Sequence, residues 1–191
     1  MLRDLMVSKV RVKLLQTFLA QPDEMFYVRQ LVRATDEEIN AVRRELLRME
    51  KGGLVKKEAR GNRLYYWFNK KHLLYGDLLS LVAKTIGLGA QIIQKKAKIG
   101  QIKFAMLSGR YPRRLPTQKD GVDLLIVGQV VMPVLTKIVT GQEKEAGREI
   151  NYSVMTQKEF DFRKKRRDPF LLGILQGSRV MLIGDEEEMV D

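Results

Sequence analysis

Residues 27–69 read YVRQLVRATDEEINAVRRELLRMEKGGLVKKEARGNRLYYWFN, and this stretch decides the fold of the first half of the chain. Residues 28–34 predict a short helix. A second helix is predicted to run to about Met49, because its apolar residues recur every three or four positions. Thr35 and Glu38 have the spacing of a capping box, in which the Thr35 side chain accepts from a first-turn amide and the Glu38 side chain accepts from the Thr35 amide. The apolar stripe consists of Ile39, Val42, Leu46 and Met49.

A β-hairpin is predicted directly after these helices. Gly52-Gly53 is expected to end the second helix. Two strand-like runs follow at residues 54–59 and 63–68, and the glycine in Arg60-Gly61-Asn62 permits a tight turn between them. Successive residues of a strand face opposite sides. In the second run, one side carries Leu64, Tyr66 and Phe68, and the other carries Tyr65 and Trp67.

A third helix is predicted upstream, over residues 5–19, and Gln21-Pro22-Asp23 is expected to end it. The order of three helices and a hairpin is the one that a winged helix-turn-helix requires. In that fold the helix directly before the hairpin, here the one that runs to about Met49, buries one stripe and offers its other face to the major groove of DNA. We therefore predict a winged helix-turn-helix over residues 1–72.

Candidate DNA contacts are the outward positions of the hairpin and of the helix directly before it. Arginine can grip guanine at two points, and asparagine can do the same with adenine. The candidates are Asn40, Arg43, Arg44 and Arg48 on the helix, and Lys56, Arg60, Asn62 and Arg63 on the hairpin. The alternative is that these are solvated charges on an ordinary small domain. Glu37, Glu38 and Glu45 favour that alternative, because carboxylates repel phosphates.

The charge of the chain is concentrated in its first half. The formal net charge is +12. Residues 1–100 carry 20 Lys and Arg against 10 Asp and Glu, whereas residues 101–191 carry 15 against 13. A basic surplus of this kind suits a polyanionic partner such as double-stranded DNA, because each phosphate that is neutralised releases counterions. The alternative is a surplus that serves solubility alone.

The stretch Tyr27–Asn69 also resembles a known family. Its segment 46–55, LLRMEKGGLV, and its segment 64–69, LYYWFN, are similar to the end of the recognition helix and to the wing of ArsR/MarR-type winged-helix regulators. The resemblance covers about a quarter of the chain and implies a DNA-binding transcriptional regulator. Such regulators read two half-sites as symmetric dimers, so we expect a homodimer. The interface candidates are Leu78, Leu79, Leu81, Val82 and Ile86. The alternative is that this apolar surface packs on the second domain of the same chain.

The second half alternates strand-like and helical segments, which predicts a small α/β domain around one sheet. The strands are expected at residues 102–107, 122–127, 149–155 and 180–183, and the helices at 132–140, 157–164 and 169–175. Within residues 73–100, a long connecting helix is predicted from Leu73 to about Lys96, loosened by Gly87 and Gly89, with a linker at 95–100. The domain is expected to occupy residues 101–184. An acidic tail over 185–191 is expected to be frayed. The fold class predicted for the whole chain is α+β.

This domain is similar to the DNA polymerase β-type nucleotidyltransferases. The similarity rests on Leu107-Ser108-Gly109, a polar loop, and Gly121-Val122-Asp123 at the start of an apolar strand. Those enzymes carry Gly-Ser and then Asp-x-Asp, whose two carboxylates share one strand face and hold metal ions. Here Arg110 follows Gly109 in place of serine, and Gly121 replaces the first aspartate. Asp120 falls on the wrong face, and Glu149 is the nearest candidate for the late carboxylate.

We therefore expect no transfer chemistry, and we expect the domain to act as a ligand sensor or partner platform. Arg110, Arg113, Arg114 and Lys119 can attract a phosphate-bearing effector. The alternative is an active metal-dependent nucleotidyltransferase that modifies a protein or nucleic acid.

Other classes of site are excluded by composition. The chain has no cysteine and a single histidine, His72. This rules out a disulfide scaffold, a thiolate zinc site and a histidine cluster. We expect no bound metal and no cofactor. The first residues lack the apolar run of a signal peptide, and no run of eighteen apolar residues occurs. A cytoplasmic protein without a membrane partner is therefore expected.

Overall fold

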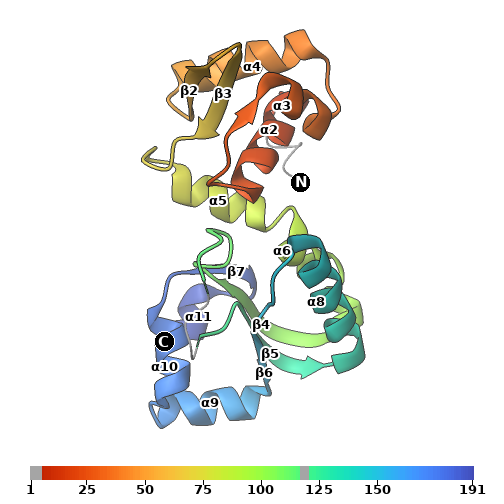
Figure 1. Cartoon of the computed structure of the whole chain (residues 1–191). Coiled ribbons are helices and arrows are strands. Elements are labelled where there is room, and N and C mark those ends of the chain that lie inside the picture. The colour runs from red at the N-terminus through yellow and green to blue at the C-terminus, as the bar shows by residue number, and fades with distance from the viewer. Residues whose placement is uncertain (1–5, 117–120) are drawn as a thin grey trace. The chain divides into compact units, whose positions relative to one another are not determined.

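The chain divides into two separately packed units, Met1–Thr85 and Ile86–Asp191 (Figure 1). The computed structural model describes residues 6–116 and 121–191. Each unit combines helices with a small β-sheet of its own. The α+β class predicted from the sequence is therefore confirmed.

The first unit is built from helices and one antiparallel sheet. Its elements in chain order are α2 (Lys9–Ala20), β1 (Phe26–Tyr27), α3 (Val28–Thr35), α4 (Ile39–Lys51), β2 (Val55–Arg60), β3 (Arg63–Phe68) and α5 (Tyr75–Ala83). The strand order is β1-β3-β2, and both outer strands run antiparallel to β3. The predicted order of helices and hairpin is thus present.

Helix α2 begins at Lys9 because Ser8 caps it. The Ser8 hydroxyl accepts a hydrogen bond from the backbone N–H of Arg11 at 3.2 Å, which satisfies one of the free first-turn donors. The predicted start, Leu5, lies outside the described residues, and Met6 to Ser8 precede the helix.

The predicted capping box of Thr35 and Glu38 is wrong. Glu38 itself caps α4, and its carboxylate accepts hydrogen bonds from the backbone N–H groups of Asn40 (2.8 Å) and Ala41 (2.9 Å). Thr35 is instead the last residue of α3, and its hydroxyl donates to the Leu31 carbonyl at 2.7 Å. Asp36 then turns the chain with a positive φ of 50°, so Glu38 is the side chain that meets the start of α4.

The core of the first unit is formed by one face of each helix and the inner face of the hairpin. Phe18 of α2 packs edge-on against Phe26 of β1, with ring centroids 5.7 Å apart. The fully buried side chains include Leu14, Leu15, Leu31, Val42, Leu46, Met49, Val55, Tyr66, Phe68, Leu79 and Val82. The apolar stripe predicted for the helix that is now α4 is therefore buried except for Ile39, which is half-buried.

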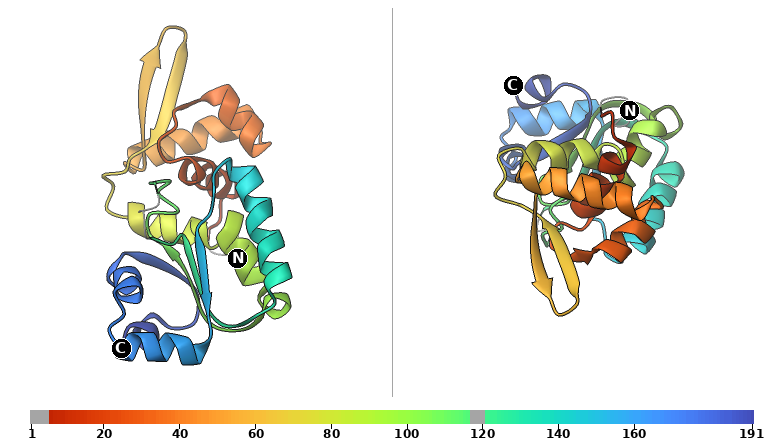
Figure 2. Two further views of the ribbon diagram at one scale, coloured as in Figure 1. Left: turned by 60° about the horizontal axis from the view of Figure 1, so that its bottom comes forward. Right: turned by 90° about the horizontal axis from the view of Figure 1, so that it is seen from above.

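The predicted hairpin is present, but its turn is one residue shorter than the predicted Arg60-Gly61-Asn62 connection. Arg60 pairs with Arg63, so Gly61 and Asn62 form the two-residue turn. Gly61 has a positive φ of 55°, which a tight hairpin turn requires at its first central position. Figure 2 shows the hairpin projecting beyond the helices of its unit. Because side chains alternate, Tyr66 and Phe68 are buried, while Tyr65 and Trp67 lie on the opposite face.

The long connecting helix predicted for residues 73–96 is wrong. The structure has three shorter helices there, among the residues that it describes: α5, α6 (Gly87–Gln94) and α7 (Lys96–Ile99). Gly87 has a positive φ of 59°, which is outside the helical region and interrupts the helix. The predicted linker at 95–100 is also structured, because it forms α7 and the first residue of a strand.

The second unit contains a mixed four-stranded sheet. Its remaining elements are β4 (Gly100–Ser108), β5 (Leu124–Val130), α8 (Met132–Ala146), β6 (Tyr152–Met155), α9 (Gln157–Lys165), α10 (Pro169–Gln176), β7 (Arg179–Ile183) and α11 (Glu186–Val190). The strand order is β6-β5-β4-β7. Strand β5 runs parallel to β6, and the other pairs are antiparallel. The late strand is shorter than predicted, since residues 149–151 precede it.

Helices cover both faces of this sheet, which explains the unbroken apolar run of β5. In Figure 1, α6 and α8 lie on one side of the sheet, and α9, α10 and α11 lie on the other. Leu125 and Val127 belong to a cluster with Phe160 and Leu171, while Leu124 and Ile126 point to the opposite face and are equally buried. The frayed tail predicted for 185–191 is wrong, because α11 buries Met189 in that cluster.

Two glycines allow β4 and β5 to approach closely. A Cβ atom at Gly128 would lie 2.2 Å from the carbonyl oxygen of Gln101, and one at Gly100 would lie 2.1 Å from that of Gln129. Their φ angles are +150° and +135°, which other residues rarely adopt. The register shifts nearby, between Ile102 and Phe104. These positions therefore require glycine for both space and backbone conformation.

Candidate nucleic-acid interface

Helix α4 presents a polar face that no other element of its unit covers. Its buried stripe consists of Val42, Glu45, Leu46 and Met49. The exposed residues are Asn40, Arg43, Arg44, Leu47 and Arg48, and each lies three or four positions from another of them, so they share one side of the helix. Arg43 and Arg44 make no hydrogen bond or ion pair with any residue that the structure describes. Both guanidinium groups therefore remain available to a ligand.

Leu47 belongs to this face but was missed by the sequence reasoning. It is 56% exposed, although it is a large apolar residue. Its position, four residues after Arg43 and three after Arg44, places it between the two arginines and Arg48. That spacing was the signal that could have identified it. A leucine on such a face can contact the methyl group of thymine.

Glu45 is buried beneath the exposed face, in contact with two arginines. Its carboxylate accepts a hydrogen bond from Arg11 Nε at 2.8 Å and one from Arg48 Nη1 at 2.7 Å. Burial acts to raise the pKa of Glu45, but the hydrogen bonds from Arg48 and Arg11 outweigh it and hold that pKa below its usual range. Arg48, a predicted DNA contact, is therefore exposed but occupied by this ion pair.

The other two acidic residues at the start of α4 are also engaged. Lys13 of α2 forms an ion pair with Glu37 at 2.6 Å. Glu38 caps the helix, and the hydrogen bonds from the Asn40 and Ala41 amides lower its pKa. The three carboxylates that favoured a merely solvated surface thus each have a partner within the first unit. Arg43 and Arg44 are therefore the cations of this face that none of these ion pairs engages.

The predicted hairpin contacts lie near the tip and on one face of the hairpin. Lys56, Arg60, Asn62 and Arg63 are all exposed. Arg60 forms an ion pair with Glu58 at 3.2 Å, and the guanidinium of Arg63 stacks over the ring of Tyr27 at 4.6 Å from its centroid. Asn62 occupies the turn itself. The hairpin therefore carries cations out to its end, with one acidic residue among them.

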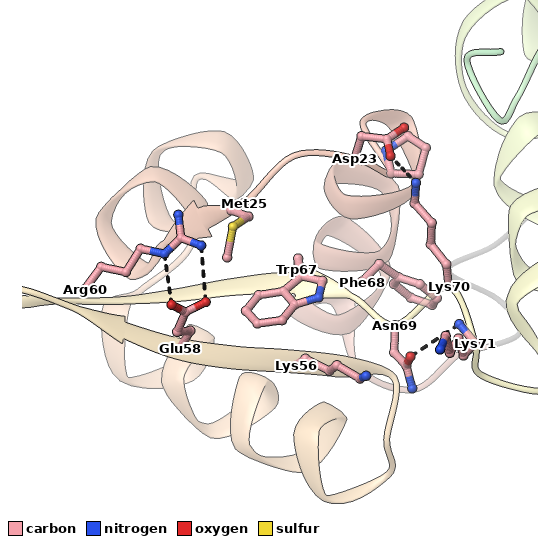
Figure 3. A pocket seen from close by; sticks show the side chains of 11 residues that line it. Asp23, Met25, Lys56, Glu58, Arg60, Trp67, Phe68, Asn69, Lys70 and Lys71 are labelled. Carbon is pink, nitrogen blue, oxygen red and sulfur yellow. Dashed lines mark hydrogen bonds and ion pairs between the residues drawn. The ribbon is translucent and has the colours of Figure 1, made fainter.

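We call the solvent-facing side of the hairpin the outer hairpin face. The register places Lys56 opposite Trp67, Glu58 opposite Tyr65, and Tyr27 of β1 opposite Tyr65 on its other side. Tyr27 and Tyr65 make an edge-on contact with ring centroids 5.9 Å apart. A groove of about 390 Å³ opens beside Trp67 (Figure 3). Its lining residues are Pro22, Asp23, Met25, Lys56, Glu58, Arg60, Trp67, Phe68, Asn69, Lys70 and Lys71.

In the second unit, the residues of the predicted residual nucleotidyltransferase site are only partly brought together. Asp123 is buried just before β5, and its carboxylate accepts a hydrogen bond from the Asn151 amide at 3.1 Å. Gly109 follows β4 and packs against Ser178, whose carbonyl accepts its N–H at 2.6 Å. The Arg110 side chain donates to the Pro116 carbonyl, and Glu149 is exposed.

Arg148 is a neighbour of Asp123 that the sequence reasoning missed. Its guanidinium lies 3.9 Å from the Asp123 carboxylate and stacks over the Tyr111 ring at 4.4 Å. It also donates to the carbonyls of Tyr111 (3.3 Å) and Leu115 (3.5 Å). Burial raises the pKa of Tyr111, so its phenol stays neutral beside this cation. Arg148 follows the end of α8, and nothing in its sequence context links it to Asp123.

The described residues 6–116 and 121–191 contain no group of three or more His, Asp or Glu side chains placed to hold a metal ion. Asp120 and Lys119, which the sequence analysis considered, lie outside the described residues. Within the described ranges, no single helix is long and apolar enough to cross a membrane. The consecutive helices α5 and α6 meet those criteria only when they are taken together.

A comparison of the chain with models of protein families, with curated proteins and with solved structures finds no match. The two family resemblances therefore depend on the residues quoted for them above.

Proposed function

We propose that the protein is a DNA-binding transcriptional regulator whose first unit is a winged helix-turn-helix. In this proposal α4 is the recognition helix and the hairpin is the wing. One observation carries the proposal. Arg43 and Arg44 on the exposed face of α4 form no hydrogen bond or ion pair with any described residue. The nearby carboxylates do: Glu38 accepts hydrogen bonds from the first-turn amides, and Glu37 and Glu45 form ion pairs. Such a face suits a polyanion.

Each proposed contact follows from the chemistry of its side chain. Arg43 and Arg44 are placed to bind guanine edges at two points, Asn40 to bind adenine, and Leu47 to contact a thymine methyl. The cations of the hairpin reach phosphates, which position the protein without reading sequence. Those hairpin residues are Lys56, Arg60, Asn62 and Arg63.

We also propose that the protein binds DNA as a homodimer, because a winged-helix regulator reads two half-sites related by symmetry. The structure narrows the interface candidates. Leu79 and Val82 are buried in the core of the first unit and are not available. Leu78, Leu81 and Ile86 are half-buried, and Leu73 and Leu74 are exposed. In this proposal a second copy packs on the four leucines of the first unit, Leu73, Leu74, Leu78 and Leu81.

Selection of bound duplexes from a random pool tests the proposed function. We expect an enriched sequence with two similar half-sites. The affinity for it should fall steeply as salt rises, because several phosphates are neutralised. Light scattering at micromolar concentration should give a dimer mass. The absence of any duplex binding at low salt would exclude the proposal, and a monomer mass both free and on DNA would exclude the dimer.

For the second unit we propose a ligand-binding or partner-binding role without transfer chemistry. A metal-dependent transferase needs carboxylates that hold two ions. Here the buried carboxylate of Asp123 faces the cation Arg148, which supplies the counter-charge that a metal ion would otherwise supply. The exposed cations Arg113 and Arg114, with Arg110, can attract a phosphate-bearing effector.

We expect no transfer of labelled nucleotide from any of the four triphosphates, to the protein itself or to a partner, with magnesium or manganese present. Asp123→Asn should leave duplex binding unchanged, because Asp123 belongs to the other unit. Label transfer by the wild type that is lost in Asp123→Asn would establish the protein as an active nucleotidyltransferase instead.

A further inference from the structure

The outer hairpin face combines aromatic rings and cations in a way that duplex recognition by α4 does not use. Tyr27, Tyr65 and Trp67 share this face across β1 and β3, since Tyr27 is opposite Tyr65 and Trp67 follows two residues later on the same strand. Trp67 is half-buried, so part of its indole stays open to the groove. Its ring N–H donates to no residue that the structure describes.

Figure 3 shows how the groove is arranged around Trp67. The indole lies along the groove, with Lys56 on the neighbouring strand and the Arg60–Glu58 ion pair toward the hairpin tip. Lys70 and Lys71 follow β3 at the other end. A flat apolar surface is thus flanked by cations along the direction of the strand.

Some charged side chains of the groove form ion pairs within it, and others do not. Its two acidic residues are paired, Glu58 with Arg60 and Asp23 with Lys70. The ammonium groups of Lys56 and Lys71 form no ion pair with any described residue, and both side chains are exposed. The groove therefore keeps two free positive charges, that of Lys56 beside the Trp67 ring and that of Lys71 beyond the end of β3, and it favours an anionic occupant that also offers a flat ring.

We propose that this groove binds single-stranded nucleic acid, with one unpaired base stacked on Trp67 and its flanking phosphates bound by Lys56 and Lys71. A polynucleotide offers a planar base and a negative charge in every residue. These match the indole of Trp67 and the free ammonium groups of Lys56 and Lys71. Stacking of a base on an aromatic side chain tolerates any base, so this site selects unpaired strands and not a sequence. The proposal does not depend on duplex recognition by α4.

The fluorescence of Trp67 tests the proposal directly, because it is the only tryptophan in the chain. We expect saturable quenching when the protein is titrated with an oligothymidylate or oligouridylate of about 15 nucleotides, a length that spans one binding site. The two oligonucleotides distinguish DNA from RNA as the better ligand. A poly-glutamate peptide should neither quench the emission nor displace the oligonucleotide.

Variants separate stacking from charge. Trp67→Ala should weaken binding of the labelled oligonucleotide about 5- to 150-fold by anisotropy, and Trp67→Phe should restore most of it, because a phenyl ring still stacks. Lys56→Ala with Lys71→Ala should lower both the affinity and its dependence on salt. Lys144→Ala, at an exposed lysine of α8, is the matched control and should change neither.

Comparison with duplex DNA keeps this proposal distinct from the proposed function. Arg43→Ala with Arg44→Ala should impair duplex binding and leave oligothymidylate binding intact, while Trp67→Phe should leave both intact and confirm that the hairpin is folded. The groove proposal is overturned if single strands do not quench Trp67, if Trp67→Ala binds them as tightly as the wild type, or if it weakens duplex binding equally. Displacement by poly-glutamate would assign the groove to an acidic peptide.

Discussion

Replacing Arg43 and Arg44 together by alanine should lower the affinity for the selected duplex about 30- to 10,000-fold, because each two-point contact with a base contributes about 1–3 kcal/mol. Binding to random DNA should weaken far less, since it depends mainly on phosphates. Anisotropy titrations with labelled selected and random duplexes, at one fixed salt concentration, measure both effects. The specificity ratio should therefore collapse along with the affinity.

The matched control removes two charges elsewhere. Lys137→Ala with Lys144→Ala takes two exposed cations from α8 and should cost little in specificity. Arg60→Ala or Arg63→Ala on the hairpin should weaken selected and random duplexes alike, as phosphate contacts do. An Arg43, Arg44 double variant that keeps wild-type affinity, or that loses selected and random DNA equally, would show that α4 does not read bases.

Gly128→Ala should destabilise the second unit by about 2–4 kcal/mol, because the new Cβ combines a clash with an unfavourable backbone conformation. The added carbon would lie 2.2 Å from the Gln101 carbonyl in the adjacent strand, so β4 and β5 must separate to admit it. Urea unfolding followed by far-UV circular dichroism would show the shift. Trp67 fluorescence reports the first unit alone and should shift much less.

Gly141 provides the control for this substitution. It lies in the exposed interior of α8, and a Cβ there would meet nothing within 4 Å. Gly141→Ala should therefore stabilise the second unit by about 0.5–1 kcal/mol through its better helix propensity. If both alanines had the same effect, or if Gly128→Ala shifted the two signals equally, the close strand approach would not be the cause.

Most elements could be predicted from the sequence, because their signals are local. The apolar period of α4 and the alternation along β3 each depend on residues only a few positions apart, and both are confirmed. The errors arise where a local pattern allows more than one outcome. Thr35 and Glu38 are both able to cap a helix, and only the path of the chain through Asp36 decides between them.

The surroundings of the candidate sites depend on contacts that no local pattern encodes. Glu45 looks like a surface carboxylate that repels DNA, yet Arg11, 34 residues earlier, pairs with it in the core. In the same way Arg148 meets Asp123 only because β5 and the segment before β6 lie side by side. The exposure of Arg43 and Arg44 was predictable from helical periodicity, whereas the pairing of their acidic neighbours was not.

The alternation of the hairpin has an evolutionary consequence. Positions 55, 66 and 68 are buried and hold the hairpin to the core. Positions 56, 58, 60, 63, 65 and 67 share the opposite, solvent-facing side. Substitution at the second set costs less folding free energy than substitution at the first, so what constrains positions 56, 60, 63 and 67 is the ligand proposed for them and not the fold. A change of ligand on this face is thus compatible with an unchanged scaffold, because the residues that meet the ligand and those that hold the fold occupy alternate codons of the same two strands.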